Sequence, residues 1–238
     1  QIVYYFSSAL SLGAPDRPVS FTVPTGNFGD VFAGYAAKRM GLPIERLVVA
    51  TNDNDILART LETGTYQTSG VVETTSPSMD IQVSSNFERL LFEASGRDAA
   101  TVTRYMQSLK QSGSFTIEAG ALAAIREEFD AGRSDMDETA ATIRAVLSQS
   151  NYLLDPHTAI AVKVAREQSP STTPMVVLST AHPAKFPVAV EAASGVIPAL
   201  PAWLGDLMER KENYTVLPSD TKMVEDHISR LSRAARNH

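Results

Sequence analysis

Residues 21–41, FTVPTGNFGDVFAGYAAKRMG, place a run of strand-forming residues directly before a glycine-bounded turn and a helical pattern. Phe21, Thr22 and Val23 favour a strand, and apolar residues recur at helical spacing after Gly29. A glycine-rich turn at the start of a helix leaves backbone N–H groups unpaired at the positive end of the helix dipole, which suits a phosphate or a carboxylate. The stretch therefore predicts an anion-binding turn between a strand and a helix.

This turn lacks the spacing of the common nucleotide-binding motifs. The G-x-G-x-x-G pattern of dinucleotide-binding proteins is absent, and no Gly-Lys-Ser/Thr follows as it does in nucleoside triphosphate loops. The structural alternative is a tight strand-to-helix connection that binds nothing. The short motif alone leaves both interpretations open.

Composition narrows the class of ligand. The chain has 238 residues, of which 43% are hydrophobic and 20% charged, as expected for a globular protein with a sizeable core. Its 21 Lys and Arg against 27 Asp and Glu give a net charge of −6, with no basic run, so nucleic acid and anionic membranes are poor partners. The absence of Cys excludes disulfides and thiolate metal sites, and the four His show no zinc-type spacing. We therefore expect a small-molecule ligand and no metal.

The first residues, QIVYYFSSALSLGAP, predict a helix that ends near Gly13. Its apolar residues Ile2, Val3, Phe6 and Leu10 fit one helical face. The segment has no basic region of a signal peptide and is too short to span a membrane. We expect a helix whose upstream part is missing, with a processing or tag-cleavage product as the alternative.

Strand and helix signals alternate along most of the chain. Residues 46–51 and 174–180 are typical of buried strands, and residues 54–64 of a helix between them that stops at Gly64. Residues 84–150 change to helical patterns, which we interpret as a helical insertion. Residues 219–236 predict a final amphipathic helix capped by Ser219 or Asp220. The predicted fold class is α/β, an open and mostly parallel sheet flanked by helices.

Polar residues gather where the predicted strands end. They lie in four segments, residues 52–55, 76–90, 155–161 and 179–187. Ligands of open α/β sheets bind outside the carboxyl ends of the strands. We therefore expect these segments to share one crevice with the glycine turn.

Several motifs in order, PTGNFGD, SPSMDI with SSNFERL, DPHTA and TAHPAKFP, closely resemble the threonine synthase family. These are pyridoxal-phosphate enzymes of the tryptophan-synthase-β-like fold. The resemblance implies a cytoplasmic carbon–oxygen lyase acting on phosphates. Its reaction converts O-phospho-L-homoserine and water to L-threonine and phosphate by β,γ-elimination and replacement. It also implies that residues 1–238 are the carboxyl-terminal portion of the pyridoxal-phosphate-binding domain.

The resemblance assigns cofactor contacts to five residues. Gly26, Asn27 and Phe28 would hold the cofactor phosphate through backbone N–H groups, with Asp30 in the first turn of the helix. Asp30 has a helix-stabilising role as its alternative, since an acid suits that end of the dipole. Thr180 would lie at the pyridine nitrogen, where a hydroxyl leaves that nitrogen largely unprotonated. A helix N-cap is the alternative for Thr180.

Arg89 is the tentative substrate-binding residue, because guanidinium groups bind phosphate in a bidentate manner. Its alternative is a surface position on a helix. The neighbouring Ser84, Ser85 and Asn86 are typical of a helix cap.

Asp155 and His157 either line the pocket or begin a helix with Asp155 as its cap and a proline in the first turn. His182 is either a pocket residue or a polar residue at a helix start. The sequence leaves both alternatives open.

The main departure from the family is the absence of its lysine. The family's Schiff-base lysine lies in a Ser-Phe-Lys-Asp segment before the phosphate turn, and no such segment occurs here. No lysine of this chain matches it: Lys38, Lys110, Lys163, Lys185, Lys211 and Lys222. We therefore expect no catalytic residue in this chain, an inactive fragment, and the missing amino-terminal half of the same enzyme as its partner. The alternatives are a serine or threonine dehydratase of the same fold, or a non-catalytic module that binds a phosphate ligand.

Overall fold

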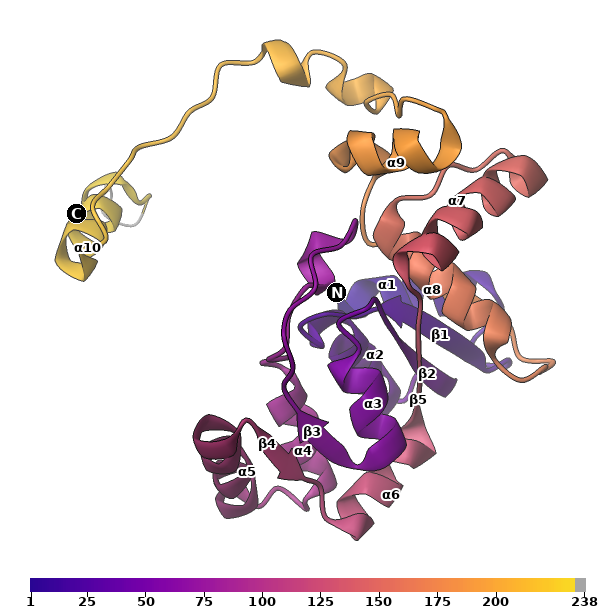
Figure 1. Ribbon diagram of the computed structural model, residues 1–238, viewed down its shortest axis with the longest axis vertical. Coiled ribbons are helices and arrows are strands. Elements are labelled where there is room, and N and C mark those ends of the chain that lie inside the picture. Colours follow the sequence, from indigo (N-terminus) through magenta and orange to yellow (C-terminus); the bar gives the residue numbers. More distant parts are fainter. Residues whose placement is uncertain (234–238) are drawn as a thin grey trace. The chain divides into compact units, whose positions relative to one another are not determined.

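The computed structural model describes residues 1–233, in two units, Gln1–Ala199 and a second unit that begins at Leu200. The first unit is built on a four-stranded sheet with strand order β5-β2-β1-β6 (Figure 1). Its strands are β1 (Val19–Pro24), β2 (Ile44–Thr51), β5 (Phe129–Arg133) and β6 (Met175–Val177).

All three strand pairs in this sheet are parallel, which confirms the predicted fold class. In the centre, Val23 of β1 lies opposite Val49 of β2. Every residue of β1 is buried, as expected for a strand covered on both faces. The carboxyl ends of β1 and β6 therefore lie side by side and open toward the same edge of the sheet.

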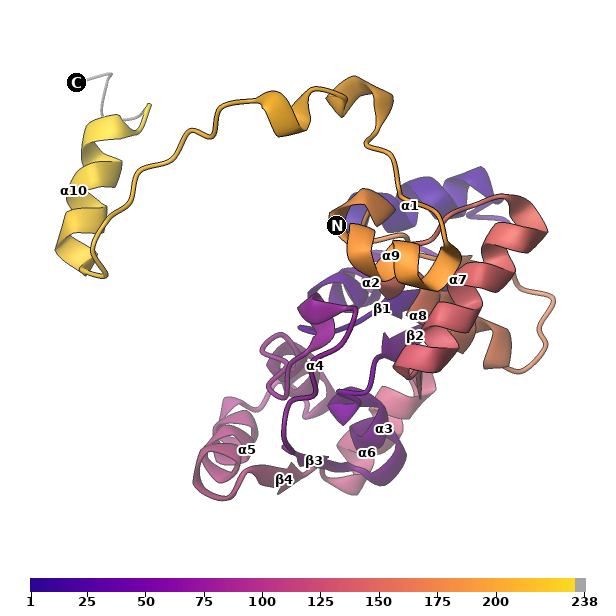
Figure 2. The same cartoon turned by 45° about the horizontal axis from the view of Figure 1, so that its top comes forward.

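Helices cover both faces of the sheet. α1 (Ile2–Ser11) and α2 (Gly29–Arg39) lie on one face, and α8 (Pro156–Glu167) lies on the other (Figures 1 and 2). Alternate strand residues divide between the two layers: Phe21 and Leu47 belong to the core cluster of α1 and α2, whereas Val48 packs with α8.

The buried face of α1 differs from the predicted one. Tyr5 and Ala9 are buried, whereas Val3 and Leu10 are 70% and 58% exposed. The reason is long-range packing, because the Tyr5 ring lies 4.8 Å from the Phe21 ring. The helix prediction was right, but the face assigned to Val3 and Leu10 was wrong.

Residues 84–150 are mostly helical, as predicted, but they also contain strands. β5 extends the main sheet at its edge, and β4 pairs antiparallel with β3, with Tyr66 opposite Phe115. The segment is therefore part of the sheet and not only a helical insertion. The remaining elements between β2 and α8 are α3 (Ile56–Thr63), β3 (Thr65–Gln67), the 3-10 helix η1 (Pro77–Met79), α4 (Phe87–Ala94), α5 (Ala99–Ser112), β4 (Ser114–Thr116), α6 (Ala119–Glu128) and α7 (Met136–Ser150).

After β6 the first unit ends with η2 (Pro183–Lys185) and α9 (Pro187–Ser194), and the second unit contains η3 (Ala202–Leu204), η4 (Leu207–Glu209) and α10 (Thr221–Leu231). Asp220 caps α10 by accepting a hydrogen bond from the Met223 N–H at 2.9 Å, as predicted. α10 ends at Leu231, and residues 234–236 of the predicted helix lie outside the described residues.

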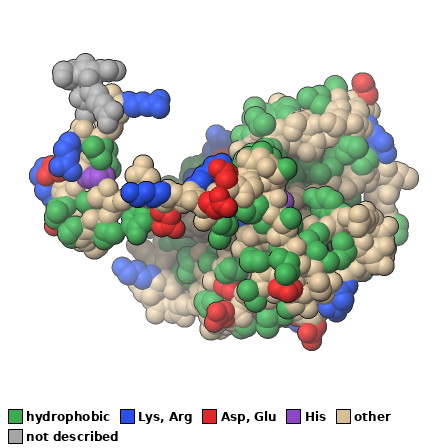
Figure 3. Space-filling model, turned by 90° about the horizontal axis from the view of Figure 1, so that it is seen from above, with side chains coloured by type: hydrophobic (Ala, Val, Ile, Leu, Met, Phe, Trp, Pro, Cys, Tyr) green, Lys and Arg blue, Asp and Glu red, His purple; other side chains and the backbone are tan. Residues whose placement is uncertain are grey.

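Two surface properties bear on possible partners. Among residues 1–233, none of the helices has the length and apolar content needed to cross a bilayer. On the face shown in Figure 3, Lys and Arg side chains lie scattered among Asp and Glu. This distribution agrees with the mixed charge composition of the chain.

Candidate functional site

The turn between β1 and α2 carries backbone strain. Phe28, the N-cap residue of α2, has a left-handed conformation with φ of 63°, which residues other than glycine seldom adopt. Its side chain is 1% exposed, and its ring packs against Phe87 at 5.3 Å and Phe129 at 5.7 Å. Core packing therefore holds the strained residue in place, a pattern that is frequent at functional sites.

The same turn presents unpaired donors. In the part of the chain that the structure describes, the N–H groups of Gly26, Asn27, Phe28 and Gly29 have no hydrogen-bond acceptor. They stand at the positive end of the α2 dipole. All four residues line one cavity of about 260 Å³. The turn thus has the donors, the dipole and the space that an anion requires.

Other segments complete the lining of this cavity. Ser78 and Met79 come from the segment after β3, and His157 comes from the start of α8. The segment after β6 contributes Thr180, Ala181, Lys185 and Phe186. The prediction that the strand ends share one crevice with the turn is confirmed for these segments. It was wrong for residues 52–55, which do not line this cavity.

Gly26 lies against the segment that contains Ser78. A Cβ atom on Gly26 would lie 2.6 Å from the Ser78 carbonyl oxygen and 3.1 Å from Met79 Cα. No real Cβ atom tolerates that approach, so only glycine fits this position.

Asp80, which does not line the cavity, holds that segment in place through hydrogen bonds. Its Oδ1 accepts hydrogen bonds from the side-chain amides of Asn52 at 2.7 Å and Asn54 at 3.0 Å, and its Oδ2 accepts one from the Thr74 N–H at 2.8 Å. Asn54 also pairs with both backbone polar groups of Val72, each at 2.8 Å. Asn52 and Asn54 therefore hold the loop in place, and they do not line the cavity of the turn.

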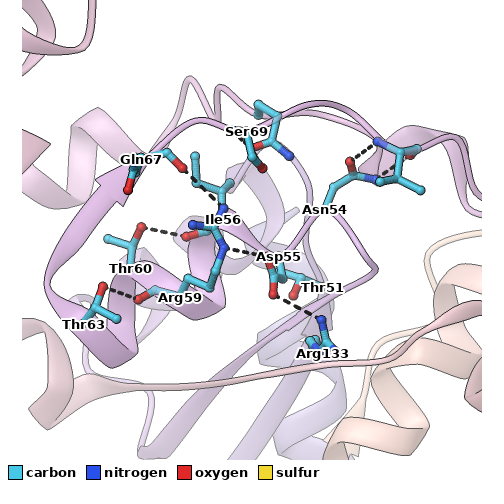
Figure 4. Close-up of polar contacts among 12 residues, drawn as sticks. Thr51, Asn54, Asp55, Ile56, Arg59, Thr60, Thr63, Gln67, Ser69 and Arg133 are labelled. Atoms are coloured by element: carbon cyan, nitrogen blue, oxygen red, sulfur yellow. Dashed lines mark hydrogen bonds and ion pairs between the residues drawn. The ribbon is translucent and has the colours of Figure 1, made fainter. Parts of the chain in front are cut away.

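The neighbouring Asp55 faces a different part of the surface. Its carboxylate accepts hydrogen bonds from Arg59 Nε at 2.7 Å and Arg133 Nη1 at 3.5 Å (Figure 4). These residues line a separate cavity beside β5. Both guanidinium groups therefore face a carboxylate in this cavity, whereas the turn presents backbone N–H groups that have no acceptor among the described residues.

The residues before α4 clamp the turn and do not cap their own helix. Ser84 Oγ donates to the Gly26 carbonyl oxygen at 2.8 Å, and Asn86 Nδ2 donates to the Asn27 carbonyl oxygen at 2.9 Å. Ser85 donates to Asn27 Oδ1 through both its N–H and its hydroxyl, each at 3.0 Å. The predicted helix cap was wrong, since α4 has no side-chain cap bond. These bonds bridge more than 50 residues, so local sequence could not reveal them.

At the start of α8, the cap interpretation holds for Asp155 and the pocket interpretation holds for His157, since Asp155 does not line the cavity of the turn. Asp155 caps the helix by accepting a hydrogen bond from the His157 N–H at 2.9 Å, and Pro156 occupies the first turn. Asp155 Oδ1 also lies 3.0 Å from His157 Nδ1. His157 lines the cavity, and its Nε2 is buried without a hydrogen-bond partner among the described residues.

Thr180 lies at the rim of the cavity, and the N-cap alternative for it was wrong. The cap of η2 is His182, whose Nδ1 accepts a hydrogen bond from the Ala184 N–H at 3.2 Å. Thr180 is exposed and lines the cavity. Its hydroxyl is therefore available to a ligand.

Asp30 lies in the first turn of α2, where its backbone and side chain both meet Tyr5. The Tyr5 hydroxyl donates to the Asp30 carbonyl oxygen at 2.7 Å and lies 3.2 Å from Asp30 Oδ1. Burial raises the pKa of the Asp30 carboxyl, although the Tyr5 hydrogen bond opposes that shift. Burial and the Asp30 charge raise the pKa of the Tyr5 hydroxyl, which therefore stays a donor.

The structure does not bring Arg89 to the turn. Its side chain is exposed, with Cζ 6.0 Å above the centre of the Phe32 ring, and it lines a shallow cavity with α4 and α5 residues. A substrate-binding role for Arg89 stays a prediction. Lys185, by contrast, lines the cavity of the turn, with Nζ 5.9 Å from the centre of the Phe186 ring. Residues 1–233 contain no cluster of His, Asp and Glu that could hold a metal ion.

Comparison with known proteins gives consistent results over nearly the whole chain. A sequence profile described as "Threonine synthase, C-terminal" matches residues 158–228. A threonine synthase from Pseudomonas aeruginosa is 52% identical over 96% of this chain and 49% of its own length, and one from Corynebacterium glutamicum is 43% identical over 96% and 49%. A crystal structure of a PLP-bound threonine synthase from Brucella melitensis superposes with a TM-score of 0.91 at 71% identity, covering 98% of this chain and 50% of that one. The chain spans about half the length of the curated relatives it matches.

Proposed function

The chain belongs to the threonine synthase family, about half of whose length it spans, and we propose that it forms the carboxyl-terminal part of a pyridoxal-phosphate-dependent threonine synthase. The proposed reaction is that of the family, the conversion of O-phospho-L-homoserine and water to L-threonine and phosphate. The enzyme class is a carbon–oxygen lyase acting on phosphates. The family also supports a cytoplasmic location.

The observation that carries this proposal is the turn of residues 26–29 with its unpaired N–H groups in a cavity. In the proposal, Gly26, Asn27 and Phe28 bind the cofactor phosphate through backbone N–H groups. The Ser84 and Asn86 side chains occupy two carbonyl oxygens of the turn. Both carbonyl oxygens are thus hydrogen-bonded to side chains of the α4 segment, while the N–H groups of the turn stay free for the anion.

Thr180 is proposed to contact the pyridine nitrogen of the cofactor. A threonine hydroxyl donates to that nitrogen without carrying charge, so the ring stays largely neutral. When bound, pyridoxal phosphate supplies an electron sink for carbanions next to the substrate nitrogen. Asp30 would stay close to the turn, where the Tyr5 hydroxyl donates to its carbonyl oxygen at 2.7 Å and lies 3.2 Å from its Oδ1.

The lysine of the family is proposed to come from the half of the family's length that this chain does not span. We use "full-length protein" for this chain joined to that half. The chain matches only about 49% of its relatives' length, which leaves room for such a segment. The described cavity would then be completed by residues from both halves.

Turnover tests the proposal directly. The full-length protein, loaded with pyridoxal phosphate and given O-phospho-L-homoserine, is expected to release threonine and inorganic phosphate in equal amounts. The same preparation is given L-serine and L-threonine to detect a dehydratase. Deamination of either amino acid without turnover of phosphohomoserine would refute the proposed reaction.

A crystal grown in phosphate tests the anion site independently of turnover. The expected result is phosphate density within hydrogen-bond distance of the N–H groups of residues 26–29. Ordered density elsewhere in the cavity, with the turn contacting only water, would contradict the assignment of the turn.

A further inference from the structure

His157 is a buried side chain with one satisfied nitrogen and one unsatisfied nitrogen. The residue is only 4% exposed, and its Nε2 has no partner within residues 1–233. Buried side-chain polar atoms without a partner are rare in folded proteins. Because His157 also lines the cavity of the turn, the missing partner is expected there.

Asp155 fixes which nitrogen is free. A carboxylate can only accept hydrogen bonds, so the 3.0 Å contact places a hydrogen on His157 Nδ1. Asp155 is itself held by the His157 N–H, by the Thr158 N–H and by the Thr158 hydroxyl. The first turn of α8 thereby orients the imidazole, and in its neutral form Nε2 keeps a lone pair.

The surroundings of His157 link it to the segment after β6. Its ring lies 4.7 Å from the Phe186 ring, and the neighbouring Thr158 hydroxyl lies 3.4 Å from Ser179 Oγ. No hydrogen bond in the described part of the chain joins His157 to residues 26–29. His157 is therefore associated with the Thr180 side of the cavity.

We infer that His157 Nε2 accepts a hydrogen bond from a hydroxyl substituent on the ring of the pyridoxal-phosphate cofactor, and that Asp155 is its positioning residue. This inference rests on the proposed function, because it takes the ring to lie beside Thr180 and the phosphate to lie on the turn. The hydrogen bond would satisfy the orphaned nitrogen and orient the ring about the phosphate.

Two substitutions of His157 distinguish the role of Nε2 from the role of Nδ1. His157→Asn places an amide near the Nδ1 position, where Asp155 can still be paired, but removes the atom at Nε2. His157→Gln reaches the Nε2 position with its amide. Dissociation constants for pyridoxal phosphate and for inorganic phosphate are measured on the full-length protein, with thermal unfolding recorded as a check on folding.

The expected result is a loss of about tenfold in affinity for pyridoxal phosphate in His157→Asn, as for one lost hydrogen bond, with a smaller loss in His157→Gln. Affinity for inorganic phosphate should stay unchanged in both variants, since the turn is intact. An unchanged affinity of His157→Asn for pyridoxal phosphate overturns the inference. A parallel loss for inorganic phosphate overturns the assignment to the ring. A parent protein that binds inorganic phosphate but not pyridoxal phosphate overturns the cofactor proposal as well, which separates the two failures.

Asp155→Ala tests the positioning role, with Asp155→Asn as the matched control. Asp155 Oδ1 both accepts the cap bond from the His157 N–H and faces His157 Nδ1, so the amide oxygen of asparagine can keep both contacts, whereas alanine removes both. Nitrogen-15 NMR of the imidazole in the full-length protein should show a changed tautomer population in Asp155→Ala but not in Asp155→Asn, together with weaker binding of pyridoxal phosphate in Asp155→Ala. A parent-like imidazole spectrum with parent-like affinity in Asp155→Ala would show that Asp155 is only a cap and overturn its positioning role.

Discussion

Gly26 is the residue at which the turn and the Ser78 segment approach too closely for a side chain. We predict that Gly26→Ala lowers the free energy of unfolding by about 1–3 kcal/mol, because its Cβ would lie 2.6 Å from a backbone oxygen. Urea unfolding measures the loss, and phosphate affinity should fall with it. Gly70→Ala is the matched control, since nothing lies within 4 Å of its added Cβ. Equal stability of the two variants would contradict the prediction.

A substitution of Thr180 should affect cofactor affinity and thermal stability differently. We predict that Thr180→Val in the full-length protein weakens cofactor affinity by roughly ten- to hundredfold, because the swap removes a hydroxyl at nearly constant shape. Melting temperature should change little, since His182 and not Thr180 caps η2. His182→Ala should show the reverse pattern, a lower melting temperature with cofactor affinity retained. Parent-like affinity of Thr180→Val would end the assignment to the ring nitrogen.

At the residue scale, the sequence predicted which residues lie on the turn better than it predicted which side chains they contact. Gly26 and Phe28 were expected on the turn from glycine spacing and helical pattern, and both line the cavity. The left-handed backbone of Phe28 could not be foreseen, because its support comes from the distant Phe87 and Phe129 rings. Of the two alternatives left open for Asp155, the structure shows the cap, a local bond that the sequence pattern could suggest.

Among the elements, the loop between β3 and α4 determines one wall of the cavity through a single carboxylate. We predict that Asp80→Asn destabilises the protein by about 1–3 kcal/mol, because the amide nitrogen would face a donor in either orientation, the Thr74 N–H or the amides of Asn52 and Asn54. Hydrogen exchange at the Thr74 N–H should accelerate more than exchange in β1. Glu73→Gln, an exposed change in the same loop, is the control. Unchanged exchange at Thr74 would show that Asp80 does not hold the loop.

The elements themselves were predictable where their pattern is local. β1, β2 and α2 have strong apolar periodicity and clear glycine or proline limits, and the structure confirms them. β5 was missed because its sequence, FDAGR, has only two apolar side chains besides a glycine, and its strand state depends on pairing with β2. The strand state of β5 therefore depends on its pairing with β2, which the local sequence does not reveal.

At the scale of the whole molecule, we propose that the half of the relatives' length that this chain does not span supplies further residues to the cavity. The chain matches about half of its relatives' length, and the sequence has no Ser-Phe-Lys-Asp segment. Lys185 is the lysine of residues 1–233 that lines the cavity. Its Nζ lies 5.9 Å from the centre of the Phe186 ring. Because Lys185 lines the cavity, it is the lysine to test against the proposed external lysine as the residue that bonds the cofactor.

We predict that the 238-residue chain binds pyridoxal phosphate without a specific covalent bond to any of its lysines. After incubation and borohydride reduction, peptide mapping should show Lys185 labelled no more than the exposed Lys110, because the motif of the family's lysine is absent here. Lys185→Met should leave the cofactor affinity unchanged within about twofold, since the turn supplies the phosphate contacts. In the full-length protein the label should fall on a lysine outside this chain. Stoichiometric labelling of Lys185 in either form would contradict the proposed division of the site between two halves.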